Sequence, residues 1–115
     1  MPNHIAQRIA LLRKLISEGL HESNLDKLVV ECDALSQDSS QVAVFFVLKH
    51  IFAELSSAID GQPVTVAAHS ELTEGISDQV LRLLDTVQRD HRVGPDEVEE
   101  LIAAHLRNLN VFRSS

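Results

Sequence analysis

The sequence predicts an all-α fold, a compact up-down bundle of four to five helices around a hydrophobic central helix. Apolar residues recur at intervals of three and four along most of the 115-residue chain, which is the period of an amphipathic helix. Glycine, proline and capping residues separate these segments at short connections, which favour antiparallel packing of consecutive helices. A chain of this length is expected to form a single domain, residues 1–115.

The first helix is expected over Asn3–Leu20 and the second over Ser23–Leu35. The first begins with a candidate N-cap and has Gly19 near its end, where a left-handed residue often terminates a helix. The second opens with a serine followed three positions later by Asp26, which approximates a capping box. Each helix has one apolar stripe, formed by Ile5, Ile9, Leu12, Leu15 and Ile16 in the first and by Leu25, Leu28, Val29, Cys32 and Leu35 in the second.

The third helix is expected over Ser39–Asp60 and is predicted to be the central one. Asp38 and Gln41 form a second candidate capping box, and a glycine and a proline follow the last residue. Apolar side chains cover more than half of its circumference, as in a helix that neighbours surround. They are Val44, Phe45, Val47, Leu48, Ile51, Phe52, Leu55, Ala58 and Ile59. Val42–Leu48 is also compatible with a strand, but the helical period continues to Ile59 and favours the helix.

A long fourth helix, Val64 to about Arg92, is the simplest interpretation of the next segment, because its apolar stripe keeps its phase through Gly75. A break near that glycine, with Ser77 as the next N-cap, is the alternative. The fifth helix begins at Pro95, a residue favoured in a first turn, and two acids follow it where the helix dipole favours negative charge. Its apolar arc comprises Val98, Leu101, Ile102, Leu109 and Phe112.

Composition argues against several classes of partner. The net charge of −7 repels phosphate backbones, and without Trp or Tyr there is little aromatic surface for stacking on bases, so no nucleic-acid partner is expected. The longest apolar run has seven residues, against about 20 for a membrane span, so no membrane partner is expected either. The single cysteine, Cys32, and an N-terminus without a secretion signal predict a cytoplasmic protein.

The histidines are the candidate functional groups. His105 falls at the centre of the apolar arc of the last helix, and His69 and His91 fall on the stripe of the fourth, so all three are expected to point inward. A histidine on an apolar face is usually a neutral core residue with a backbone partner. The alternatives are a metal-binding protein or enzyme that uses histidines and carboxylates, or a phosphorelay intermediate with His69 as acceptor. His50 and Glu54 are expected to form a pair on the solvent side of the third helix.

Apolar residues on polar faces indicate interaction. Phe46 projects beside His50 on the polar side of the third helix. Val30 likewise projects from the polar side of the second helix. Leu109 and Phe112 form an apolar tip that docks either on its own bundle or on another chain. With no catalytic residues, metal ligands or cofactor predicted, we expect a non-enzymatic protein-interaction or regulatory module that forms a homo-oligomer, with a dimer favoured, or binds another protein.

Overall fold

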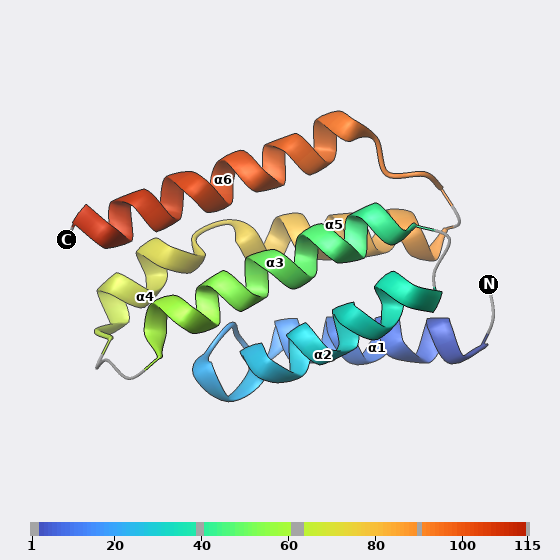
Figure 1. The fold of residues 1–115 in the computed structure, drawn as a ribbon, viewed down its shortest axis with the longest axis horizontal. Coiled ribbons are helices and arrows are strands. Elements are labelled where there is room, and N and C mark those ends of the chain that lie inside the picture. The colour runs from blue at the N-terminus through green and yellow to red at the C-terminus, as the bar shows by residue number, and fades with distance from the viewer. Residues whose placement is uncertain (1–2, 39–40, 61–63, 90, 115) are drawn as a thin grey trace.

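The computed structural model describes residues 3–38, 41–60, 64–89 and 91–114, and these residues form an all-α bundle without a strand, as predicted (Figure 1). The helices of the described ranges are α1 (Asn3–Ser17), α2 (Glu22–Asp38), α3 (Val42–Ile59), α4 (Val66–Thr73), α5 (Ile76–Gln88) and α6 (Pro95–Ser114).

The helices alternate in direction along the chain (Figure 1). α2 packs along α3, α1 packs against α2 and α5, and α6 packs against α4, α5 and α3. α4 and α5 follow one another in the same general direction and together form one arm of the bundle. The predicted up-down arrangement is therefore confirmed, with the fourth arm in two pieces.

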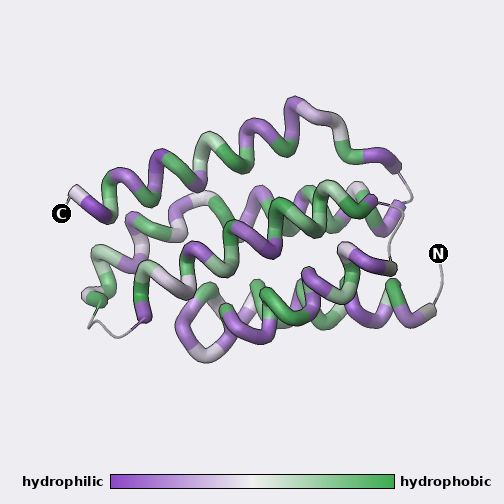
Figure 2. The backbone as a smooth tube through the Cα atoms, in the orientation of Figure 1, coloured by the Kyte–Doolittle hydropathy of each residue, from purple (hydrophilic) through white to green (hydrophobic). Residues whose placement is uncertain are grey.

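The helix α3 has one buried face rather than neighbours on all sides. Seven of its 18 residues are buried, and they face α2 and the rest of the core: Val44, Phe45, Leu48, Ile51, Phe52, Leu55 and Ile59. Hydrophobic residues nevertheless run over most of the helix (Figure 2). By length and composition alone α3 could cross a membrane, a criterion that core helices of soluble proteins also meet. The expectation that neighbours surround α3 is wrong, because its opposite face is exposed.

The predicted long fourth helix is wrong, and the alternative break is confirmed. α4 ends at Thr73 and α5 begins at Ile76, with Gly75 at φ 75° between them. The N-cap of α5 is this glycine and not the serine two residues later. Asn108 Nδ2 of α6 donates a hydrogen bond of 2.7 Å to the carbonyl oxygen of Glu74. This bond links the segment between α4 and α5 to the last helix.

Substituting Gly75 with alanine is expected to lower the free energy of unfolding by about 1–2 kcal/mol, because an L-residue is disfavoured in the left-handed conformation. A Cβ at this position would meet no atom within 4 Å, so the whole effect comes from the backbone. Gly94→Ala is the matched control, because Gly94 has equal space and no positive φ. Urea denaturation measures both, and equal losses would contradict the backbone explanation.

The predicted capping box at Ser23 and Asp26 is wrong, whereas the one at Asp38 and Gln41 lies partly outside the described residues. The Gln41 side chain reaches across to the segment before α6, where it accepts from the Val93 N–H (3.2 Å) and donates to the His91 carbonyl (3.1 Å). α2 begins at Glu22, and the hydroxyl of Ser23 hydrogen-bonds His21 Nδ1 rather than capping the helix. The side chains of the other predicted cap residues, Asn3 and Asp38, lie outside the described residues.

Candidate functional site

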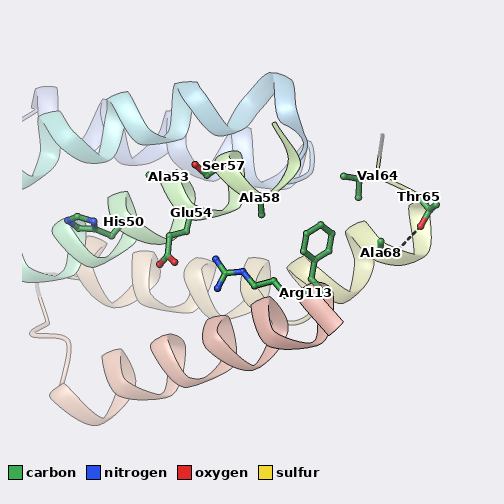
Figure 3. Close-up of a pocket in the computed structure, with 10 residues that line it drawn as sticks. His50, Ala53, Glu54, Ser57, Ala58, Val64, Thr65, Ala68 and Arg113 are labelled. Atoms are coloured by element: carbon green, nitrogen blue, oxygen red, sulfur yellow. Dashed lines mark hydrogen bonds between the residues drawn. The ribbon is translucent and has the colours of Figure 1, made fainter. Parts of the chain in front are cut away.

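A groove of about 920 Å³ opens where α3, the start of α4 and the end of α6 meet (Figure 3). We call it the α3–α6 groove. The residues that line it are His50, Ala53, Glu54, Ser57 and Ala58 of α3, Val64, Thr65 and Ala68 at the start of α4, and Phe112 and Arg113 of α6. The Thr65 hydroxyl accepts a hydrogen bond of 3.1 Å from the Ala68 N–H and so fixes the first turn of α4 at the edge of this groove.

The groove has a polar part and an apolar part. His50, Glu54 and Arg113 lie together in the polar part (Figure 3). The apolar part lies toward α4, where Ala58, Val64 and Ala68 are found (Figure 3), and Phe112 adds an apolar side chain to the lining. The groove can therefore hold a molecule with a polar group joined to an apolar one.

A buried histidine holds the carboxylate of Glu54 in place. His105 is 2% exposed, and its Nε2 lies 3.2 Å from Glu54 Oε1. A carboxylate only accepts hydrogen bonds, so Nε2 carries the proton. The other ring nitrogen, Nδ1, is buried without a hydrogen-bond partner among the described residues. The predicted inward orientation of His105 is confirmed.

The expected pair of His50 and Glu54 is replaced by two different contacts. Glu54 pairs with His105 of α6. His50 is exposed, and its ring packs edge-on against Phe46 with centroids 4.6 Å apart. Because the Glu54 carboxylate hydrogen-bonds His105 of α6, it does not pair with His50 on its own helix.

The two other candidate histidines differ from one another. His69 is half-buried, and its Nε2 donates to the Leu20 carbonyl oxygen at 2.6 Å, so one of its two ring nitrogens is engaged within the chain. His91 is exposed in the connection between α5 and α6. Its predicted inward orientation is wrong, because α5 ends at Gln88 and the helical stripe stops there.

The residues predicted for interaction fall into two groups. Phe46 is 52% exposed and Val30 is 64% exposed, as expected from their faces. Val30 lines a separate shallow groove between α1 and α2 with Leu11, away from the α3–α6 groove. Leu109 is only 3% exposed, so this part of the C-terminal tip packs into its own core and does not offer a surface. Phe112 packs half-buried against the same core and lines the α3–α6 groove.

Cys32 is a core residue rather than a nucleophile. Its thiol is fully buried, and burial, assisted by the negative charge of Glu31, raises its pKa to about 12. Since the thiolate is the reactive form, the folded protein holds this sulfur unreactive near neutral pH. Within the described ranges, no three His, Cys, Asp or Glu side chains lie close enough to bind a metal ion together.

Neither a known family model, nor a curated protein, nor a solved structure matches this chain. The pairing of Glu54 with His105 and the position of Arg113 beside it were not predicted. The only sequence signal for them is that His105 lies at the centre of an apolar arc and so needs a polar partner from another helix.

Proposed function

We propose that this protein is a non-enzymatic protein-interaction module that forms a homodimer through the outward face of α3. The observation that carries the proposal is that α3, which is hydrophobic over most of its length (Figure 2), leaves one whole face exposed to solvent. This face, which we call the α3 seam, consists of five exposed residues: Ala43, Phe46, His50, Ala53 and Ser57.

The spacing of the seam fits a second helix. Its residues follow one another at intervals of three, four, three and four, which is the a/d spacing of a coiled coil. In an antiparallel pair related by a two-fold axis, Phe46 of one copy lies opposite Ser57 of the second copy, and His50 lies opposite Ala53. Each large side chain thus meets a small one, and the symmetry repeats the contact.

The charged residues beside the seam also favour a dimer contact there. Lys49 Nζ lies 2.8 Å from Asp33 Oδ1 of α2, and Glu54 is held by His105. Because Lys49 and Glu54 already have partners within the chain, a second helix can pack beside them without leaving either of these two side chains unpaired. The two-fold axis of this pair passes between His50 and Ala53, and Phe46 lies next to this centre in ring contact with His50.

Sedimentation velocity and native mass spectrometry over a range of concentrations test the proposal. We expect a dimer for the unaltered protein and a monomer for Phe46→Glu, because the substitution places a charge in the seam. Val30→Glu is the matched control, since Val30 is at least as exposed as Phe46 but lies on another face. Circular dichroism checks that both variants fold. A monomeric unaltered protein, or dissociation by Val30→Glu instead of Phe46→Glu, would refute the proposal.

A further inference from the structure

We infer that the α3–α6 groove binds a peptide segment that presents a neutral amide next to a large apolar side chain. This inference deepens the proposed function, because it names the chemistry of a second partner. It rests on Glu54, Arg113 and Phe112, which are not part of the α3 seam, although His50, Ala53 and Ser57 belong both to the seam and to the lining of the groove.

A carboxylate and a guanidinium face the same space in the polar part of the groove. The side chains of Glu54 and Arg113 point toward one another from α3 and α6 (Figure 3), but they do not form an ion pair in the structure. Arg113 has neither a hydrogen-bond nor an ion-pair partner among the residues that the structure describes. The groove thus offers one strong acceptor and one strong donor that a ligand can satisfy together.

A neutral amide fits this pair better than an ion does. An amide carries an N–H that donates to Glu54 and a carbonyl oxygen that accepts from Arg113. An anion is attracted by Arg113 but repelled by Glu54, and the reverse holds for a cation. The opposite charges therefore select a ligand group that is polar but uncharged.

The acceptor is held in position before any ligand arrives. The His105 ring is enclosed by the core and fixes one carboxylate oxygen of Glu54, so little side-chain freedom of this group is lost on binding.

The apolar part of the groove defines the rest of the ligand. Ala58, Val64, Ala68 and Phe112 surround a space beside the polar pair without contributing a charge. The volume of about 920 Å³ is within the range of binding sites for small molecules and peptide side chains. A leucine-sized side chain placed here removes apolar surface of both molecules from water.

Three probes that share a leucine side chain and differ in their end groups and charge test the inference: N-acetyl-leucinamide, which is neutral, N-acetyl-leucine, an anion, and leucinamide, a cation. Each is titrated into the isotopically labelled protein at pH 6.5 and followed by amide chemical shifts. We expect the neutral probe to bind most tightly and to shift Ala53, Ala58 and Ala68. Tighter binding of either charged probe, or shifts confined to other surfaces, would overturn the inference.

Variants then assign the effect to the polar pair. Arg113→Gln is expected to weaken binding of N-acetyl-leucinamide about tenfold, the effect of losing one charge-assisted hydrogen bond. Arg107→Gln is the control, because Arg107 is also exposed on α6 but lines a different pocket. Equal binding by Arg113→Gln and Arg107→Gln would contradict the assignment.

The same titration separates this inference from the proposed dimer. Phe46→Glu removes the α3 seam contact and leaves Glu54, Arg113 and Phe112 unchanged. We expect it to bind N-acetyl-leucinamide at least as tightly as the unaltered protein does, because a second copy on the seam also covers His50, Ala53 and Ser57 at the groove. If the protein is monomeric but the neutral probe binds in the groove, only the dimer is refuted. If the unaltered protein is dimeric and the probe binds in the groove of neither this dimer nor the monomeric Phe46→Glu variant, only the groove inference is refuted.

Discussion

Replacing Phe52 with alanine is expected to lower the free energy of unfolding by about 3–5 kcal/mol. The Phe52 side chain is completely buried on the core face of α3, so the substitution loses the burial of the ring and leaves a cavity. A domain of this size has a total stability of about 5–15 kcal/mol, so the loss is a large part of it. Urea denaturation followed by circular dichroism at 222 nm measures the change.

The control is the same substitution six positions earlier on the same helix. Phe46 is half-exposed, so Phe46→Ala is expected to change the stability of the monomer by no more than about 0.5 kcal/mol. The comparison is made at concentrations where the protein is monomeric, because a dimer would add its own stability. Similar losses for both variants would contradict the division of α3 into a core face and an exposed face.

The two faces of α3 show how much of the fold the sequence could predict. Helical spacing alone placed Phe45 and Phe52 inward and Phe46 outward, and the structure agrees on all three. Each helix is long enough for its apolar stripe to define a direction toward the core. The number of arms and their alternation follow from these stripes and from the short connections between them.

The break at Gly75 shows what helical spacing alone cannot predict. Leu72 and Ile76 are both buried, so the apolar stripe continues in phase across the interruption and gives no sign of it. The left-handed glycine permits the break, and Asn108 stabilises it from 34 residues away in the sequence. A contact at that separation depends on how α6 lies across α4 and α5, which local spacing does not specify.

The candidate site could not be predicted from the sequence for the same reason. Glu54 and His105 are 51 residues apart, and the sequence assigned Glu54 a partner on its own helix. The groove exists only because α4 starts beside the end of α6. Residue spacing predicted that His105 points inward, but only the packing of α6 against α3 identifies the acceptor that it meets.

Removing that acceptor gives the second large expected effect. Glu54→Ala leaves both ring nitrogens of the buried His105 without a protein partner and is expected to cost about 1–3 kcal/mol of stability. Glu54→Gln keeps a side-chain carbonyl oxygen that can accept from Nε2, so it is expected to cost less. Chemical denaturation of the variants at pH 7 measures the difference, and Glu99→Ala, an exposed acid on α6, reports the effect of losing a glutamate at the surface.

A double-mutant cycle shows whether the loss comes from the hydrogen bond itself. His105→Leu replaces the ring with an apolar side chain that needs no acceptor, and in this background Glu54→Ala is expected to have an effect close to that of Glu99→Ala. The coupling arises because a buried polar group is costly only when its partner is missing. If Glu54→Ala cost the same with His105 or with leucine at that position, the carboxylate would not be holding α6 against α3 through this ring.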